Sequence, residues 1–318
     1  MTHRERARIA LTGGQPDFVP TFELVFHETE RDFGGRTFYG GPEEPGRTGK
    51  THREMLEHNA QLYMDIAGRF DHSIIMVTSV PGREGERPTE DDVADTVKII
   101  RDKTGDEFFI VAHGDATYSI PSGTGMMEFS YRIVDDPEGL EVEAQTRVEQ
   151  TIPRAERLME AGLDGFALCA DYAFNAGPFL PPDWFAEFVT PYLKQIIAAE
   201  REMGAITIKH TDGNIEAILD QLVDANPHAL HSLDPMAGMD IKSVKERYGD
   251  RMALCGNVHC AHLQTGTPEQ IRESAEYCLT YAKPGGGYVF STSDCVFRGM
   301  PLESYDLIHR IWMERRDY

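Results

Sequence analysis

The chain has 318 residues, of which 41% are hydrophobic and 26% are charged, a mixture typical of a globular protein with a large core. Its formal net charge of −22 argues against nucleic acid as a partner, because phosphate backbones require clustered lysine and arginine side chains. We find no window that approaches 18 uncharged apolar residues, so we expect no membrane span and no membrane partner.

The chain opens with a basic amphipathic stretch, residues 1–14, for which we predict an N-terminal helix. No apolar segment of the kind found in signal peptides follows it. The 5 cysteines are odd in number and widely scattered, a pattern typical of free thiols or metal ligands rather than of a disulfide framework. These features predict a cytoplasmic protein.

Three irregular stretches, rich in glycine, proline or both, interrupt the chain at residues 34–54, 78–92 and 118–129. The first contains Gly-Gly and proline turns and is predicted to be a long loop between elements. None is rich enough in proline, glycine or serine to divide domains. We therefore expect residues 1–318 to form a single domain.

Short apolar runs alternate with long amphipathic stretches along the rest of the chain. The amphipathic stretches include residues 135–162, 181–204 and 267–287, which we predict to be helical. Apolar runs alternating with helices indicate a parallel sheet covered by helices. Eight strands close a TIM barrel, the predicted α/β fold, and an open doubly wound sheet is the second possibility. The predicted strands are residues 19–26, 73–77, 108–114, 165–170, 205–210, 228–233, 252–258 and 287–293.

Polar side chains collect where these predicted strands end, which in a barrel is where the chemistry lies. Strand ends are polar in any protein, since they meet loops and solvent, so part of this set has no chemical role. The candidate residues are Glu23, His27, Thr78, His113, Asp115, Cys169, Asp171, His210, Asp212, Asp234, Asn257, His259, Asp294 and Cys295.

His210 and Asp212 follow one strand at positions i and i+2, so both side chains can turn into the barrel mouth. Cys295, after the last strand, could join them across the mouth. A nitrogen, an oxygen and a sulfur ligand with one open position form the arrangement of a catalytic zinc site. The alternative is that Asp212 opens a turn with Gly213 and that His210 is a hydrogen-bonded interior residue.

Other histidines offer weaker metal sites. His259, Cys260 and His262 stand where the chain turns into a helix, and this turning is expected to separate their side chains. We predict ordinary loop residues there. His228 and His231 should point to opposite faces of a strand, as packing and surface residues.

Paired carboxylates could serve acid–base chemistry if they are close and partly desolvated. The candidate pairs are Asp171 with Asp212 and Glu23 with Asp171. Substrate hydrogen bonding by the same side chains stays equally open. A serine nucleophile is not supported, because no G-x-S-x-G sequence occurs.

Several long segments resemble the uroporphyrinogen decarboxylase-like superfamily, whose fold is a TIM barrel. They are RERARIALTGGQPDFVP, GPFLPPDWFAEFVTPYLKQII, HTDGNIEAILDQLVD, LDPMAGMDIKSVKERYGDRMALCGNVH and PGGGYVFSTSDCVFRGMPLESY. In the decarboxylase branch an arginine-containing segment follows the first strand and an aspartate ends the second. FELVFHETERDFGG and IIMVTSVPG lack these features at the matching places, so the resemblance disfavours uroporphyrinogen decarboxylation.

The other branch of this superfamily consists of zinc-dependent methyltransferases that exchange methyl groups with a corrinoid protein or a thiol. Their zinc motif is His-x-Cys at the fifth strand end, with a second cysteine near the carboxyl terminus. His210 and Cys295 match two of these positions, and Asp212 replaces the middle cysteine. The resemblance implies demethylation of a small methylated substrate, such as an O-methyl aromatic, with transfer to a corrinoid (cobalamin) on a partner protein. His210, Asp212 and Cys295 would hold the zinc.

The resemblance also suggests roles for other residues. Glu23 would be a fourth ligand or a proton donor, and Asp171 and Tyr172 would orient the substrate. His113 and Asn257 complete the expected substrate-binding set. Aromatic and methionine side chains near the loops indicate an apolar pocket. These are Phe174, Phe179, Met126, Met127 and Phe297.

Two other functions stay open. One is a metal-free lyase of the decarboxylase type, with Asp171 and Asp212 as acid and base. The other is a binding protein that keeps the fold without catalysis. The oligomeric state is equally open, and a homodimer is the commonest arrangement among soluble oligomers.

Overall fold

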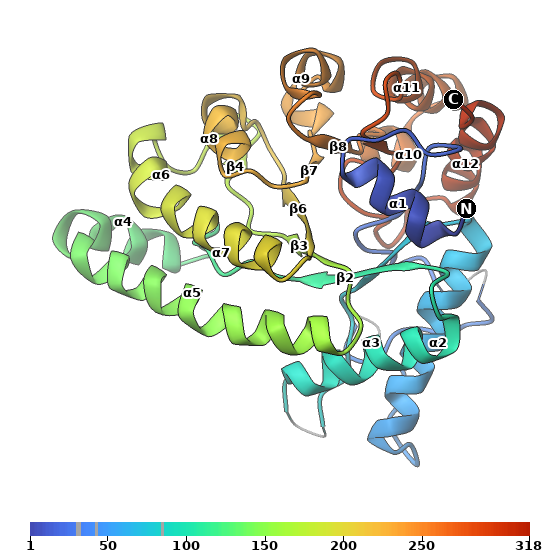
Figure 1. Ribbon diagram of the computed structural model, residues 1–318, viewed down its shortest axis with the longest axis horizontal. Coiled ribbons are helices and arrows are strands. Elements are labelled where there is room, and N and C mark those ends of the chain that lie inside the picture. The colour runs from blue at the N-terminus through green and yellow to red at the C-terminus, as the bar shows by residue number, and fades with distance from the viewer. Residues whose placement is uncertain (30–32, 42–43, 84–85) are drawn as a thin grey trace.

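The computed structural model describes residues 1–29, 33–41, 44–83 and 86–318, and its centre is a parallel sheet of seven strands. The strands follow the order β1-β2-β3-β6-β7-β8-β9, and helices cover the outside of the curled sheet (Figure 1). Each of these strands lies within a range predicted from the sequence, apart from the last residue of β6. They are β1 (Ile74–Val77), β2 (Phe109–His113), β3 (Gly165–Leu168), β6 (Ile206–Thr211), β7 (Ala229–Ser232), β8 (Ala253–Cys255) and β9 (Tyr288–Val289). A separate antiparallel pair consists of β4 (Ala173–Phe174) and β5 (Gly177–Pro178).

Several of the described helices start at residues whose side chains cap them. Capping boxes at Thr2, Thr51, Thr89 and Thr267 satisfy backbone N–H groups at the first turns of four helices. The helices are α1 (His3–Leu11), α2 (His52–Phe70), α3 (Glu90–Thr104), α4 (Gly125–Asp135), α5 (Pro137–Glu160), α6 (Pro182–Phe188), α7 (Thr190–Glu202), α8 (Leu219–Asp224), α9 (Ile241–Tyr248), α10 (Cys260–Thr265), α11 (Pro268–Tyr281) and α12 (Leu302–Arg315). Two short 3-10 helices are η1 (Glu216–Ile218) and η2 (Pro235–Ala237).

One helix prediction and one loop prediction need correction. The stretch 181–204 forms two helices, α6 and α7, which meet at Val189. Pro191 at the start of α7 has no N–H to continue the hydrogen bonds of α6, which explains the break. The predicted loop 118–129 is irregular only to Thr124, since α4 begins at Gly125.

The segment predicted as the first strand, residues 19–26, is extended but forms only isolated bridges. Pro20 has no N–H, so it contributes no donor to a strand ladder at that position. It nevertheless contacts both edges of the sheet. The Ser73 nitrogen, next to β1, donates to the Thr21 oxygen at 2.7 Å, and the Phe290 nitrogen, next to β9, donates to the Pro20 oxygen at 2.9 Å. The fold is therefore TIM-barrel-like, with seven regular strands.

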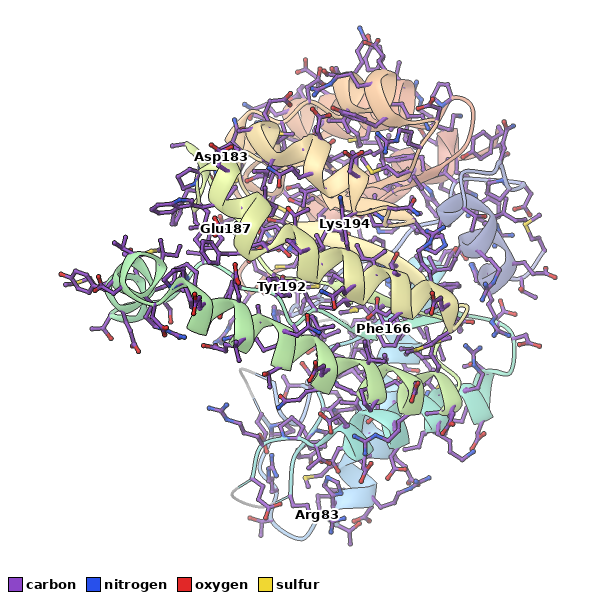
Figure 2. All side chains as sticks on the ribbon, turned by 60° about the vertical axis from the view of Figure 1, so that its left-hand side comes forward. Arg83, Phe166, Asp183, Glu187, Tyr192 and Lys194 are labelled. Atoms are coloured by element: carbon purple, nitrogen blue, oxygen red, sulfur yellow. The ribbon has the colours of Figure 1, made fainter. Side chains whose placement is uncertain are left out.

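Alternate strand residues face two different cores, as the pleat requires. One core lies inside the curve of the sheet, where α1 contributes Ala7, Ala10 and Leu11. The other lies between the sheet and the surrounding helices. α5 and α7 lie side by side in this outer layer, where Tyr192 is buried while Glu187 and Lys194 are exposed (Figure 2). Within the described residues, no helix has the length and apolarity needed to span a membrane.

Candidate metal centre and substrate cleft

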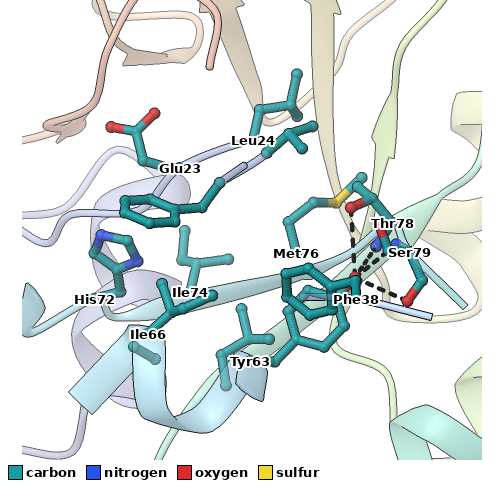
Figure 3. Close-up of a pocket in the computed structure, with 14 residues that line it drawn as sticks. Glu23, Leu24, Phe38, Tyr63, Ile66, His72, Ile74, Met76, Thr78 and Ser79 are labelled. Atoms are coloured by element: carbon teal, nitrogen blue, oxygen red, sulfur yellow. Dashed lines mark hydrogen bonds between the residues drawn. The ribbon is translucent and has the colours of Figure 1, made fainter. Parts of the chain in front are cut away.

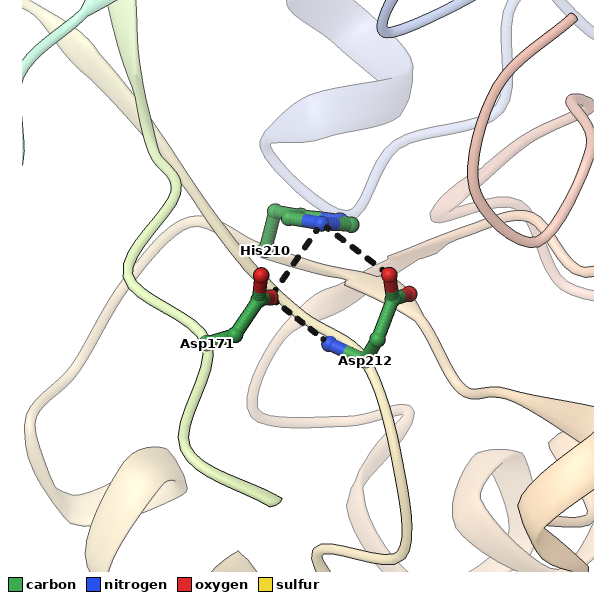
Figure 4. Close-up of side chains that lie close together, drawn as sticks. All are labelled: Asp171, His210 and Asp212. Atoms are coloured by element: carbon green, nitrogen blue, oxygen red, sulfur yellow. Dashed lines mark hydrogen bonds and ion pairs between the residues drawn. The ribbon is translucent and has the colours of Figure 1, made fainter. Parts of the chain in front are cut away.

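Three side chains that can bind a metal converge at the carboxyl ends of β3 and β6 (Figure 4). One ligand atom from each of Asp171, His210 and Asp212 lies within 4.8 Å of the others. The Nε2 atom of His210 is 3.6 Å from Oδ1 of Asp171 and 3.9 Å from Oδ2 of Asp212. An imidazole nitrogen with two carboxylates is a ligand set that zinc and other divalent cations accept.

The pairing of the strands explains why these side chains meet. Ile206 and Ile208 face the inner core, so His210, two residues further along β6, turns toward the same interior. β3 pairs in parallel with β6, and both strands therefore end at the same side of the sheet. Asp171 follows β3, and its Oδ1 accepts a hydrogen bond of 3.1 Å from the Asp212 backbone nitrogen.

Several carboxylates lie close together in this region and leave it with an excess of negative charge. Burial raises the pKa of Asp212 to about 7, and Asp294, Asp171 and Asp234 add to the rise by repulsion. Ser232 opposes this rise, because its hydroxyl donates a hydrogen bond of 2.6 Å to Oδ1 of Asp212. The pKa of Asp294 is also raised, by burial and by the charges of Asp171 and Asp234. A bound cation would relieve this repulsion.

His210 has a second histidine as its partner. Burial lowers the pKa of His210 well below the ordinary value, so the ring is neutral, which is the form that metals bind. The Nδ1 atom of His210 is 2.7 Å from Nδ1 of His231. The sequence did not predict this pairing, which arises because the register of β6 and β7 places the two residues side by side and turns both side chains inward. His228 does face another way, and its ring contacts Thr207.

Cys295 lies outside the Asp171–His210–Asp212 group. Its Sγ is 3.4 Å from Oδ2 of Asp294, and burial, followed by the Asp294 charge, raises the pKa of the thiol. The third metal-capable side chain of the group is therefore Asp171, whereas the sequence suggested the thiolate of Cys295. Cys295 as a zinc ligand stays a prediction.

Glu23 lies on the outer side of its segment, because Phe22 and Leu24 fill the inner core. Its carboxylate accepts hydrogen bonds from Thr292 Oγ1 at 2.6 Å, from the Thr292 nitrogen at 3.1 Å and from the Tyr305 hydroxyl at 3.1 Å. Burial raises its pKa to about 8. Glu23 is therefore not part of the group around His210, and Thr292 stands between them.

A small cavity of about 30 Å³ adjoins Glu23 between α2 and β1 (Figure 3). Glu23 and His72 contribute its ionisable groups, while Phe38, Ile66 and Met76 supply apolar walls. This volume is far below the roughly 300 Å³ or more of pockets that hold small organic ligands, so the cavity is not the expected substrate site.

Tyr172 belongs to a buried network of hydrogen bonds and a cation–π contact at the ends of the strands. Its hydroxyl is 2.5 Å from Thr117 Oγ1, and its ring lies 4.0 Å from the Lys209 ammonium. Lys209 is fully buried and donates to Asp115 at 2.8 Å and to the Leu168 oxygen at 3.0 Å. These bonds tie the ends of β2, β3 and β6 together. Substrate contact by Tyr172 stays a prediction that its complete burial does not favour.

The two remaining predicted substrate residues lie in different places. His113 ends β2 and is close enough to His210 to lower the pKa of that ring. Asn257 is buried, and its amide contacts the Leu233 oxygen at 2.6 Å and Cys278 Sγ at 3.4 Å. It lines a separate cavity of about 220 Å³, so it does not border the cleft next to Asp212.

His259 and His262 stack on each other, with ring centroids 4.0 Å apart. Their neighbour Cys260 contacts Ser293 Oγ instead, at 3.4 Å. In the part of the chain that the structure describes, Asp171, His210 and Asp212 form the one group of three metal-capable side chains. The predictions for 259–262 therefore need correction, because Cys260 and His262 lie in α10 rather than in a loop, and only Cys260 is separated from the two stacked histidines.

A cleft of about 570 Å³ opens beside the metal-capable group. Its acidic lining residues are Asp212, Asp234 and Asp294. Phe174 and Phe297, both suggested by the sequence as pocket residues, are aromatic residues of the same lining. Among the described residues that border it there is no lysine or arginine. Its size suits a small organic molecule. The other lining residues are Ala173, Asn175, Gly213, Met236, Cys260, Ala261, Gln264 and Ser293.

The fold and this site define an α/β protein of the TIM-barrel type with its polar centre at the carboxyl ends of the strands. The uroporphyrinogen decarboxylase (URO-D) family model matches residues 75–311. The chain therefore belongs to this family, which confirms the resemblance seen in the sequence. A uroporphyrinogen decarboxylase of Psychromonas ingrahamii is 30% identical over 148 residues, which are 43% of this chain and 40% of that protein. The match thus spans less than half of that relative.

Solved structures show the same fold. A methyltransferase from Methanosarcina mazei superposes with a TM-score of 0.74 at 22% identity, over 99% of both chains. A B12-independent methionine synthase from Shewanella sp. W3-18-1, solved in complex with selenomethionine, has a TM-score of 0.53 at 12% identity, over 96% of this chain and 98% of that one. At these identities the similarity shows the shared fold alone.

Proposed function

We propose that the protein is a zinc-dependent methyltransferase that moves a methyl group from a small methylated substrate to a corrinoid carried by a partner protein. The convergence of Asp171, His210 and Asp212 at the edge of a ligand-sized cleft carries this proposal. Membership of the URO-D family supports an enzyme, and the fold shared with a methyltransferase is consistent with this chemistry.

The residues fit a divalent metal by their chemistry. Two carboxylates and a neutral imidazole nitrogen converge. Burial, and then the charges of neighbouring carboxylates, raise the pKa of Asp212, and a cation would offset both effects. Zinc takes nitrogen from histidine and oxygen from aspartate. When bound, zinc would supply a Lewis acid that draws electron density from the atom carrying the methyl group.

The chain's own residues would hold and orient the substrate. Phe174 and Phe297 line the same cleft as the carboxylates and offer apolar surface that suits the ring of an O-methyl aromatic. Ser232 holds one oxygen of Asp212, so that the other faces His210. Glu23 keeps a proton near neutral pH, since its pKa is about 8.

A metal-free lyase is the second candidate, favoured by the pKa of about 7 for Asp212, which suits proton transfer. The cleft opposes a substrate with many carboxylates, because the described residues that line it include acidic groups but no lysine or arginine. Decarboxylation of uroporphyrinogen is therefore the less favoured function.

Metal analysis of the purified protein and its variants tests the proposal. We expect bound zinc in the wild type and in His259→Ala, the matched control, and loss of zinc in His210→Ala and Asp171→Asn. Cys295→Ser separates the two ligand sets, since it keeps the metal if Asp171 is the third ligand. Methyl transfer to Co(I) corrinoid would then be followed by absorbance with a methoxyarene as donor. Full metal content in His210→Ala would contradict the proposed site, and decarboxylation that survives chelation would favour the lyase.

A further inference from the structure

His231 is a buried residue with a chemical consequence for the metal-capable group. It is fully buried on β7, directly beside His210 on β6. Its two ring nitrogens have different partners. Nδ1 is 2.7 Å from Nδ1 of His210, and Nε2 is 3.3 Å from the Thr292 oxygen and 3.3 Å from Ser291 Oγ.

The partners of His231 determine where its proton lies. The carbonyl oxygen of Thr292 can only accept, so Nε2 of His231 carries the hydrogen. All of these partners are uncharged groups inside the protein, where a charged ring would be costly. Nδ1 of His231 is therefore an acceptor, and the hydrogen between the two rings belongs to Nδ1 of His210.

We propose that His231 is a positioning residue that holds His210 in the Nδ1–H tautomer and so leaves Nε2 of His210 free to bind a metal beside Asp171 and Asp212. The orientation of the His210 ring agrees with this role, because its Nε2 is the atom that lies 3.6 Å from Asp171 and 3.9 Å from Asp212. Ligating histidines usually donate their other N–H to a carboxylate, a carbonyl or water. Here a second histidine has that role.

His231 is itself held in place from two sides. Phe22 packs against its ring with centroids 5.3 Å apart and an interplanar angle of 64°. The backbone of Thr292 is held in turn by Glu23, whose carboxylate accepts the Thr292 N–H at 3.1 Å. This chain of contacts connects Glu23 to His210 through Thr292 and His231. Glu23 thereby supports the site from the outer layer without touching it.

The tautomer is measurable without any variant. Two-dimensional ¹H–¹⁵N spectra of histidine-labelled, metal-free protein distinguish Nδ1–H from Nε2–H rings. We expect Nδ1–H for His210 and Nε2–H for His231, with signals assigned from single substitutions. An Nε2–H ring at His210 would overturn the proposal.

Variants test the consequence for metal binding. His231→Leu removes the acceptor and should weaken zinc affinity by about 10- to 100-fold, the range typical of lost outer partners. His231→Asn keeps an amide oxygen near the place of Nδ1 and should restore most of that affinity. His72→Leu is the matched control, since His72 is also buried but bonds to Tyr305 away from the group. Affinity is measured by competition with a chromophoric chelator.

The outcomes separate this proposal from the proposed function, on which its metal-binding part rests. Thermal melting without metal shows whether a variant is folded, and the wild-type spectra decide the tautomer if His231→Leu does not fold. Wild-type affinity in His231→Leu, or an equal loss in His231→Asn and His231→Leu, would overturn the positioning role. A protein with the expected tautomers that binds no zinc would contradict the proposed function alone.

Discussion

At the scale of single residues, two acidic groups have raised pKa values for related reasons. Asp212 stands among other carboxylates at the cleft, and burial together with their charges raises its pKa to about 7. Glu23 is almost fully buried at 5% exposure, and burial is the largest cause of its pKa of about 8. Repulsion at Asp212 favours a cation, whereas Glu23 simply retains its proton.

Glu23→Gln should change how stability depends on pH. The folded protein keeps the Glu23 proton up to about pH 8, whereas an unfolded chain loses it near pH 4.3. Between these values the folded state binds more protons, so its stability falls as pH rises. Glutamine removes this loss. The variant should match the wild type near pH 4 and exceed its free energy of unfolding by on the order of a few kcal/mol at pH 9.

Urea unfolding at both pH values checks this prediction. Glu246→Gln, at an exposed glutamate on α9, is the control for the chemical change itself. A difference between Glu23→Gln and the wild type that is the same at both pH values would mean that ionisation of Glu23 is not its cause.

At the scale of elements, the turn after β6 determines where Asp212 lies. Gly213 has φ of +83°, in the left-handed region that favours glycine. A Cβ atom there would be 2.2 Å from the Ala173 oxygen. The turn therefore packs tightly against β4, and the β3 and β6 ends are further joined by Lys209 and its partners.

Gly213→Ala should destabilise the protein by more than about 3 kcal/mol, because backbone strain and a clash with backbone add together. Gly204→Ala is the matched control. Gly204 has nearly the same φ, +82°, but no atom lies within 4 Å of the added Cβ, so only the conformational cost of about 1–2 kcal/mol is expected. Denaturant unfolding measures both. Equal losses of unfolding free energy in the two variants would show that the positive φ alone, and not the contact with Ala173, requires glycine at position 213.

At the scale of the whole molecule, residues 19–26 connect the two edges of the seven-stranded sheet. The amide of Ser73 donates to Thr21, and the amide of Phe290 donates to Pro20. If this segment completes a barrel, these two amides should exchange hydrogen only by global unfolding. Native-state exchange by NMR should then give them the same opening free energy as the amide of Val111 in β2. Fast exchange at Ser73 and Phe290 would instead indicate an open sheet with a loosely attached segment.

Much of this architecture could be predicted from the sequence. The apolar runs located the seven strands, because the pattern of a buried strand is a local property. Long family segments identified the superfamily and drew attention to His210 and Asp212. His231 was missed, although a histidine at the end of the neighbouring strand was a signal, because its role depends on the register between β6 and β7.

What the sequence determined by itself is local: seven strands, several of the helices, the family and the acidic, metal-capable residues at the strand ends. Only the tertiary structure decided which of these residues meet. It brought Asp171 rather than Cys295 to His210, placed Glu23 in the outer layer, and paired His210 with His231. The reason is physical, since strand register and the face that each side chain takes are set by contacts between residues far apart in the chain.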